Sequence, residues 1–137
     1  MEKNIKEETI FEKIINRGIA ADIIYEDEKH LAFLDIQPFE KGHILVIPKF
    51  PYETVFEMPE NDYLDLQRVV YKIVNKIQDE LGGGLNILQN NFPIAGQIVP
   101  HVHFHLIPRN EKKELYCKNK SEYNEGEKEE FFEKLKF

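Results

Sequence analysis

The feature that most restricts the fold of this chain is a strict alternation of histidines and apolar residues around position 103. The alternating residues are His101, Val102, His103, Phe104, His105 and Leu106. In a β-strand, side chains at i, i+2 and i+4 point to the same face of the sheet. The histidines therefore share one face, about 7 Å from neighbour to neighbour, and the apolar residues share the other. The alternation predicts a strand over residues 101–107 whose apolar face packs against a helix and whose histidines form an open polar row.

Hydrophobic periodicity predicts the elements around this strand. Apolar residues at helical spacing predict a short helix over residues 9–16 and a long helix over residues 60–81, which three consecutive glycines end. Strand-like runs cover residues 22–26, 31–36, 43–47 and 85–89. Five strands joined mainly by hairpins, with one face covered by a long helix, are typical of an α+β domain. We therefore expect a five-stranded antiparallel sheet with one long and one short helix.

The chain has the length of one domain followed by a polar tail. Its 137 residues are 42% hydrophobic and 31% charged, which is ordinary for a globular protein. We place the domain at residues 1–109 and the tail at residues 110–137, where the sequence becomes polar and repetitive. A short amphipathic helix is predicted from about Glu127, and its Phe131, Phe132 and Leu135 could dock on the body or on a partner. A loosely ordered, solvated tail is the alternative.

Charge and composition argue against several classes of partner. The formal net charge of −7 disfavours binding of nucleic acid through a broad cationic face, but it is compatible with a small anionic ligand in a local pocket. No apolar run approaches the ~20 residues that span a bilayer, and no signal peptide opens the sequence, so we expect no membrane association. The single cysteine, Cys117, cannot form an internal disulfide, and we expect a cytoplasmic protein.

Three imidazoles on one face of a strand fit two kinds of chemistry. Histidines at i and i+2 can chelate a metal such as zinc, with His43 or a carboxylate completing the ligand set. Alternatively, the central imidazole can attack phosphorus while its neighbours hydrogen-bond to phosphate oxygens and assist the leaving group. Crowding favours the second chemistry, because adjacent imidazoles do not all carry charge and some stay neutral and nucleophilic. A metal site needs only ligands, whereas a phosphorus site also needs groups that bind the rest of a nucleotide.

Several other residues are candidates for such groups. Asp35 ends a strand at the edge of an apolar segment, and its carboxylate could accept both hydroxyls of a ribose. His43 opens the following strand, and Asn90 closes the strand before the histidine row. Gly96, followed by Gln97, would let the backbone approach a ligand closely. Each feature alone also has an ordinary structural explanation, as a cap, a turn or a satisfied hydrogen-bonding residue, whereas His30 is expected in a solvated hairpin turn without a role.

Together these features resemble the histidine triad nucleotide-binding superfamily. The segment HVHFHLI at residues 101–107 fits that family's alternating signature at every position. Further likeness lies in TIFEKIINRGIAADIIYEDEKHLAFLDI (9–36), GHILVIPK (42–49) and AGQIVPH (95–101). The opening segments look most like the phosphoramidase branch, and the ending HLIPR looks more like the bacterial and dinucleoside polyphosphate hydrolase branches.

The resemblance implies a homodimer with a continuous ten-stranded sheet and a covalent mechanism. By position, His103 would attack the α-phosphorus of an AMP-type nucleotide and form a nucleotidyl-histidine that water hydrolyses. His105 would bind the phosphate and assist the leaving group, and His101 would orient and polarise the row. The resemblance requires no metal and no cofactor for this reaction.

The resemblance also implies how the nucleotide is held. Asp35 would bind the ribose, and Phe33 and Ile36 would lie near the base. His43 would stand beside the triad as a fourth histidine. The remaining contacts, to the phosphate or the leaving group, would come from Asn90, Gly96 and Gln97.

The sequence departs from the family pattern at several positions. Thr9 and Glu12 stand where many members carry two zinc-binding cysteines, so we expect no structural zinc. Pro51 replaces a histidine common in the family, and Pro100 replaces a larger residue before the triad. Ile98 stands where the phosphoramidase branch often has a hydroxyl residue.

Three hypotheses about function follow from the sequence. The first is a nucleotidyl hydrolase or transferase that acts on AMP-linked compounds, either dinucleoside polyphosphates or nucleoside phosphoramidates. The second is a non-catalytic purine nucleotide-binding protein, which the apolar Ile98 favours. The third is a metalloprotein that uses the histidine row.

Overall fold

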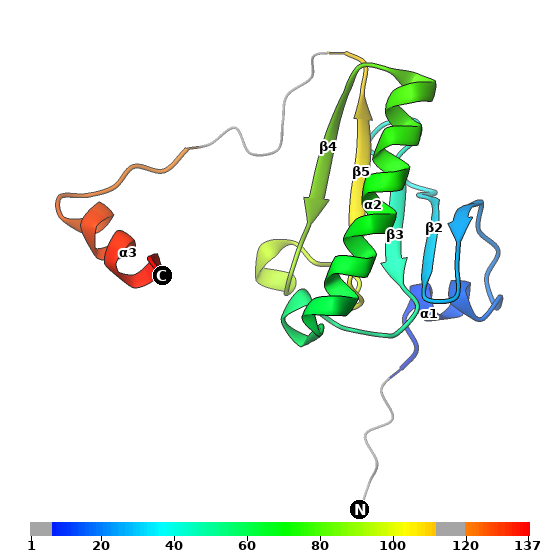
Figure 1. Cartoon of the computed structure of the whole chain (residues 1–137), viewed down its shortest axis with the longest axis horizontal. Coiled ribbons are helices and arrows are strands. Elements are labelled where there is room, and N and C mark those ends of the chain that lie inside the picture. Colours follow the sequence, from blue (N-terminus) through cyan, green and yellow to red (C-terminus); the bar gives the residue numbers. More distant parts are fainter. Residues whose placement is uncertain (1–6, 112–119) are drawn as a thin grey trace, which may run out of the picture.

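The computed structural model describes residues 7–111 and 120–137 as one five-stranded sheet with helices on both of its faces (Figure 1). The strands are β1 (Ile23–Glu26), β2 (His30–Leu34), β3 (Ile44–Pro48), β4 (Gly84–Gln89) and β5 (Phe104–Arg109). The α-helices are α1 (Ile10–Ile15), α2 (Glu60–Leu81) and α3 (Glu127–Leu135), and short 3-10 turns occupy Val55–Glu57 and Pro93–Ala95. None of the helices in these described ranges is long and apolar enough to cross a bilayer.

All strand pairings are antiparallel, in the spatial order β1-β2-β3-β5-β4. The pairing of β3 with β5 places Leu45 opposite His105 and Ile44 opposite Leu106. This register brings the first half of the chain beside the histidine strand. The predicted α+β class, with a five-stranded antiparallel sheet and one long helix, is confirmed.

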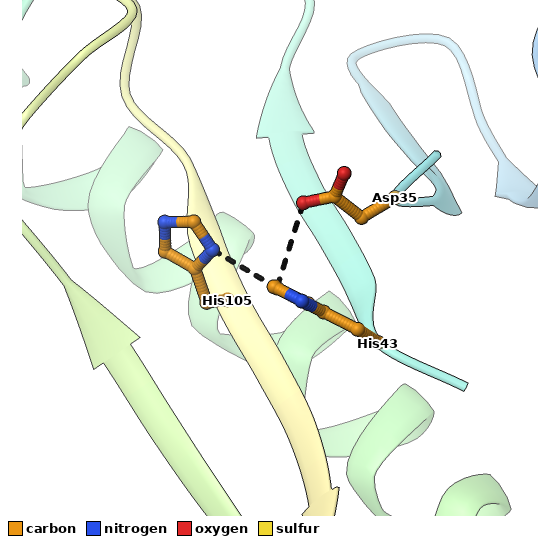
Figure 2. Close-up of side chains that lie close together, drawn as sticks. All are labelled: Asp35, His43 and His105. Atoms are coloured by element: carbon orange, nitrogen blue, oxygen red, sulfur yellow. Dashed lines mark hydrogen bonds and ion pairs between the residues drawn. The ribbon is translucent and has the colours of Figure 1, made fainter. Parts of the chain in front are cut away.

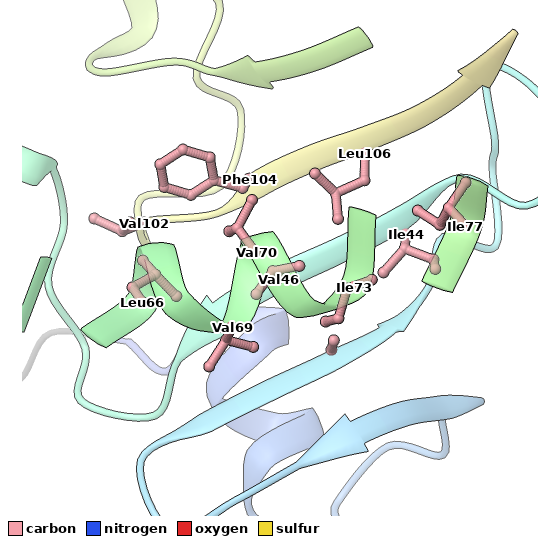
Figure 3. Packing of buried hydrophobic residues seen from close by; sticks show 11 residues of the cluster. Ile44, Val46, Leu66, Val69, Val70, Ile73, Ile77, Val102, Phe104 and Leu106 are labelled. Atoms are coloured by element: carbon pink, nitrogen blue, oxygen red, sulfur yellow. The ribbon is translucent and has the colours of Figure 1, made fainter. Parts of the chain in front are cut away.

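Helix α2 covers one face of the sheet. Its apolar side chains recur at helical spacing, and Leu66, Val70 and Ile73 are each at most 4% exposed. They pack against inward-facing residues of β3 and β5 and of the segment before β5 (Figure 3), namely Ile44, Val46, Val102, Phe104 and Leu106. The apolar half of the histidine alternation therefore lies under the long helix, as the sequence predicts.

The opposite face is only partly covered, by the six-residue helix α1. Thr9 caps this helix: its hydroxyl accepts the Glu12 N–H (3.1 Å), and the Glu12 carboxylate accepts the Thr9 N–H (3.4 Å). Phe11 and Ile14 of α1 pack on the sheet in a second cluster with Leu31, Phe33, Leu45 and Ile47. Because α1 spans fewer than two turns, part of this face stays open for a cavity.

Two predictions about histidines need correction. The strand predicted over 101–107 begins only at Phe104, because Pro100 has no N–H, the His101 N–H closes a turn onto the Val99 carbonyl (2.8 Å), and the Val102 N–H bonds to the Tyr52 carbonyl (2.8 Å). His30 is not a solvated turn residue. It is the first residue of β2, is 7% exposed and bonds to Asp27 through Nδ1 (2.9 Å).

The other boundaries shift by no more than two residues, and α3 starts at Glu127 as predicted. Its Phe131, Phe132 and Leu135 are 46%, 64% and 72% exposed. Cys117 lies outside the described residues.

Candidate active site

A cavity of about 450 Å³ opens on the α1 face of the sheet. Its walls are mainly apolar, with Phe11 and Ile14 from α1 and Phe33 and Leu45 from the sheet. A few polar side chains converge in it, namely Asp35, Gln37, Asn90, His103 and His105. An apolar cavity of this size with a few converging polar groups has the character of a small-molecule binding site.

The four histidines of the site form a compact cluster rather than an open row. The ring centroids of His103 and His105 are 4.8 Å apart, and those of His105 and His43 are 5.2 Å apart. His43, His101 and His103 are at most 4% exposed, and only His105 is half-buried. The expectation of an open row is wrong because Phe11 of α1 lies edge-on over His103 and His101, with centroids 5.0 and 5.8 Å away.

Two main-chain carbonyls determine which nitrogens of His101 and His103 carry hydrogen. His101 Nε2 lies 2.7 Å from the Pro48 carbonyl oxygen, and His103 Nδ1 lies 2.7 Å from the His101 carbonyl oxygen. A carbonyl only accepts, so each of these nitrogens donates an N–H. A neutral His103 therefore has its lone pair on Nε2. Its ring lines the cavity, and that lone pair suits nucleophilic attack.

Burial favours the neutral form of His43, His103 and His105. It lowers the pKa of His103, although the hydrogen bond to the His101 carbonyl and the Asp35 carboxylate both act to raise it. Burial also lowers the pKa of His43. The Asp35 carboxylate acts to raise this pKa, whereas Arg109 and His103 lower it further. The pKa of His105 falls to about 4, first because of burial and then because His103 and His43 lie close by. Near pH 7 all three imidazoles are uncharged, as a nucleophile requires.

Asp35 follows β2 directly and faces His43 (Figure 2). The Gln37 N–H donates to one carboxylate oxygen at 2.9 Å, which fixes the side chain in the loop. The other oxygen lies 3.8 Å from His43 Nε2, and His43 Nε2 is 3.0 Å from His105 Nδ1. The half-buried carboxylate lines the cavity, where it can accept hydrogen bonds from a ligand.

The structure brings most of the other predicted binding residues to the cavity. Phe33, Ile36, Asn90 and Gly96 line it, with Phe33 buried and Ile36 exposed at the rim. Gly96 has a φ of 92°, a conformation that glycine adopts readily, and its carbonyl accepts a hydrogen bond from Asn90 at 3.5 Å.

Gln97 differs from this expectation. Its side chain is not among the groups that line the cavity, and the residue is 5% exposed. Its Oε1 accepts the Phe92 N–H and its Nε2 donates to the Glu53 carbonyl, each at 2.7 Å. Both ends of the amide are thus engaged in joining two loops, which is a supporting arrangement rather than a ligand contact.

A comparison with known protein families matches residues 16–112 to the HIT domain. The chain belongs to the HIT domain family. It is 51% identical over 102 residues to an uncharacterized HIT-like protein of Methanocaldococcus jannaschii, covering 74% of this chain and 79% of that protein. It is 42% identical over 108 residues to the adenosine 5'-monophosphoramidase HNT1 of Candida albicans, covering 75% of this chain and 71% of that protein.

The fold agrees with solved structures of HIT proteins. A crystal structure of a HIT family member from Bacillus subtilis superposes with a TM-score of 0.83 at 39% identity, over 94% of this chain and 95% of that one. The predicted histidine triad membership is therefore confirmed.

Two aromatic residues of this HIT site were not predicted from the sequence. Phe11 covers the histidines, but its spacing with Ile15 in the short helix indicated only a core position. Phe39 stacks on His43 with centroids 5.5 Å apart and an interplanar angle of 17°. Phe39 lies in a loop, where no periodicity marks a residue as buried or exposed.

Among the described residues, one group could offer three metal ligands: atoms of Asp35, His43 and His105 lie within 4.8 Å of one another. The hydrogen bonding does not fit a metal. The Phe39 N–H donates to His43 Nδ1 at 3.1 Å, so His43 carries its hydrogen on Nε2, the nitrogen that would have to bind. Metal-bound histidines normally donate their second N–H instead of accepting one there. The donor set therefore suits hydrogen bonding better than metal coordination.

Proposed function

We propose that this HIT protein is a nucleotidyl hydrolase that cleaves AMP-linked substrates at the α-phosphorus through a nucleotidyl-histidine at His103. The observation that carries the proposal is the 2.7 Å bond from His103 Nδ1 to the His101 carbonyl. It leaves the Nε2 lone pair of a neutral imidazole available at a cavity of nucleotide size. The monophosphoramidase activity named for the Candida relative supports the same class of reaction.

The first step forms one bond and breaks one. His103 Nε2 attacks the α-phosphorus, and the bond from phosphorus to the leaving group breaks. The leaving atom keeps that electron pair and takes up a proton from solvent. The His103 ring becomes a cation whose Nδ1–H still donates to the His101 carbonyl, and this charge-assisted bond is stronger than the neutral one.

The second step restores the enzyme. Water attacks the phosphorus, the phosphorus–Nε2 bond breaks and its electron pair returns to His103. A proton passes from the attacking water to solvent, and a nucleoside monophosphate is released. The half-buried Asp35 lines the cavity and would accept the ribose hydroxyls, and Phe33 and Ile36, which also line it, would offer apolar contacts to a base.

The charge of the cavity favours a phosphoramidate over a dinucleoside polyphosphate. Among the described residues that line it, none is a lysine or an arginine, and the one charged side chain is the carboxylate of Asp35. A chain of three or four phosphates would enter this cavity without a cationic partner. A single phosphate can be held by imidazole and backbone N–H groups. We therefore propose nucleoside 5'-phosphoramidates as the preferred substrate class.

The test combines adduct trapping with a substrate panel. Acid-quenched protein incubated with adenosine phosphoramidate should show, by intact mass spectrometry, a nucleotidyl adduct on a peptide that contains residue 103. His103→Gln should remove the adduct, and His30→Gln, the same change at a buried histidine elsewhere, should retain it. Adenosine phosphoramidate should be cleaved faster than diadenosine tri- and tetraphosphate. Turnover without any adduct would refute the covalent route.

A specific observation favours a second candidate, a nucleotide-binding protein without catalysis. Ile98 lines the cavity and is 91% exposed, where the phosphoramidase branch often has a hydroxyl residue. Calorimetry that shows AMP binding, with no product from any substrate of the panel, would favour this candidate.

We also infer that the protein forms a homodimer through β4 and α2. Among the residues that the structure describes, β4 is the last strand on its side of the sheet, and its outer edge has no partner strand there. Leu64 and Tyr71 of α2 line one surface region with Ile87 of β4, and these side chains are 43%, 72% and 54% exposed, respectively. Light scattering should give the mass of a dimer, and Ile87→Glu should shift it to that of a monomer.

A further inference from the structure

A chain of hydrogen bonds runs from the backbone to His105. The Phe39 N–H lies 3.1 Å from His43 Nδ1, and His43 Nε2 lies 3.0 Å from His105 Nδ1. His105 in turn lines the cavity beside His103. The chain thus begins at a main-chain amide and ends at a ring that lines the cavity.

The direction of every bond in this chain is set by its first member. An amide N–H only donates, so His43 Nδ1 must accept and a neutral His43 carries its hydrogen on Nε2. That hydrogen points to His105 Nδ1, which must accept in turn. A neutral His105 therefore carries its own hydrogen on Nε2. The Asp35 carboxylate oxygen, 3.8 Å from His43 Nε2, also favours a hydrogen on that nitrogen.

The loop that holds the Phe39 amide is itself fixed. The Asp35 N–H donates to the His43 carbonyl at 2.9 Å, and the His43 N–H donates to the Glu40 carbonyl at 3.1 Å. Arg109, at the end of β5, contacts the Glu40 carboxylate at 3.3 Å. The Phe39 ring stacks on the His43 ring. The Arg109–Glu40 contact joins the loop to β5, and the other contacts close the loop between β2 and β3, so the amide is held against His43.

We propose that the main-chain N–H of Phe39 is a positioning group that sets the tautomers of His43 and His105, so that His105 presents an N–H donor at Nε2 beside the lone pair of His103 Nε2. The two neighbouring histidines receive opposite roles from opposite backbone groups. The His101 carbonyl makes His103 an acceptor at its Nε2. The Phe39 amide, acting through His43, makes His105 a donor at its own Nε2.

The arrangement has a consequence for catalysis that rests on the proposed function. In the pair of His43 and His105, both ring nitrogens that lack a hydrogen already accept hydrogen bonds, so an added proton finds no free lone pair. His105 then acts as a neutral donor to a phosphoryl oxygen or the leaving atom, not as an imidazolium acid. The charged or titratable groups that face the pair are Asp35, Arg109 and His103, and Asp35 alone favours protonation.

The direct test is nitrogen NMR of the histidine rings in uniformly ¹⁵N-labelled full-length protein at pH 7. Two-bond and three-bond couplings identify which ring nitrogen carries hydrogen. We expect His43 and His105 with hydrogen on Nε2, and His101 also on Nε2, whereas His103 carries it on Nδ1. A hydrogen on Nδ1 of His43 or of His105, or a cationic ring in either, would overturn the proposal. This result is independent of turnover, so it stands even if no nucleotide is cleaved.

A matched pair of variants separates the amide from the ring. Phe39→Ala keeps the N–H and removes the stacking, whereas Phe39→Pro removes the N–H. Phe39→Ala should keep the Nε2–H signals of His43 and His105. Phe39→Pro should lose the single tautomer of His105 and lower kcat at least tenfold, with a pH–rate profile altered on its acidic side. Retention of both signals in Phe39→Pro would refute the role of the amide. Should Phe39→Pro not fold, loss of both signals in Phe39→Ala would assign the tautomers to stacking and overturn the proposal equally.

Discussion

The two faces of the sheet are built from the same strands but are covered to very different extents. Helix α2, with 22 residues, seals one face with five apolar side chains that are each at most 5% exposed: Leu66, Val69, Val70, Ile73 and Ile77. Helix α1, with six residues, covers only part of the other face, and the uncovered part forms the cavity with its histidines. The alternation of residues 101–106 contributes to both: Val102, Phe104 and Leu106 belong to the sealed face, and the histidines belong to the open one.

This difference separates stability from chemistry. Burial of apolar side chains under α2 contributes stability in proportion to the area removed from water. On the α1 face, burial of imidazoles lowers their pKa and opposes their protonation. A change on the α2 face should therefore alter the free energy of unfolding, whereas a change on the α1 face should alter turnover.

The largest effect is expected at His103. Replacing it by alanine removes the proposed nucleophile, so kcat for a nucleoside phosphoramidate should fall by about three orders of magnitude or more. Binding of AMP, measured by calorimetry, should change by less than about tenfold, because Asp35 and the apolar walls remain. Residual activity within tenfold of the parent protein would exclude His103 as the nucleophile. It would also contradict the assignment of the chemistry to the α1 face.

The converse change is Leu66→Ala on the α2 face. Leu66 is fully buried, and its truncation should lower the free energy of unfolding by about 2–5 kcal/mol, measured by urea denaturation. The kcat of the folded fraction should stay within about twofold. As a control, Leu81→Ala, on the same helix but at a position 48% exposed, should cost less. A large loss of kcat in Leu66→Ala would show that the two faces are coupled.

The fold could be predicted from the sequence where the pattern is local. The period of the long helix and the alternation before Ile107 each place apolar residues on one side, so α2, the sheet and the core follow from them. The histidine cluster was recognised, but its burial was not, because it depends on Phe11, about ninety residues earlier in the chain. The buried His30 could have been predicted better, because Asp27, three residues before it, offers a hydrogen-bond partner.

Two features of the site lie beyond what side-chain patterns report. The tautomers are set by main-chain groups of Pro48, His101 and Phe39, and every residue has such groups except for the N–H that proline lacks. The side chain of Gln97 is directed by the positions of two loops, at Phe92 and Glu53. Only the tertiary arrangement shows whether such an amide faces a ligand or the protein.

Acidification should destabilise the α1 face in particular. Histidines in the unfolded chain bind protons as the pH falls through about 6.5. In the folded protein the pKa values of His43, His103 and His105 are lower, about 4 for His105, so these rings bind protons only at lower pH. The unfolded state then binds more protons, so stability is full above pH 6.5 and falls as the pH drops toward 4. Urea denaturation should show a decrease of up to about 1.4 kcal/mol per pH unit for each histidine. His105→Asn should flatten this dependence; an unchanged slope would contradict the role assigned to its burial.

The smallest effect is expected at Ile98, and it concerns specificity rather than rate. Because Ile98 is 91% exposed, Ile98→Ser should change the free energy of unfolding by less than about 0.5 kcal/mol. The side chain lines the cavity three residues before the triad, and we expect a leaving group to lie on that side. An exposed apolar wall favours an apolar leaving amine, since its contact removes apolar surface of both from water. Ile98→Ser should lower kcat/KM several-fold for an adenosine phosphoramidate of a long-chain alkylamine. For the unsubstituted phosphoramidate, kcat/KM of the variant should stay within about twofold of that of the parent protein. Equal changes in kcat/KM for both substrates would mean that residue 98 does not contact the leaving group. The specificity of the α1 face would then come from its contacts with the nucleotide alone.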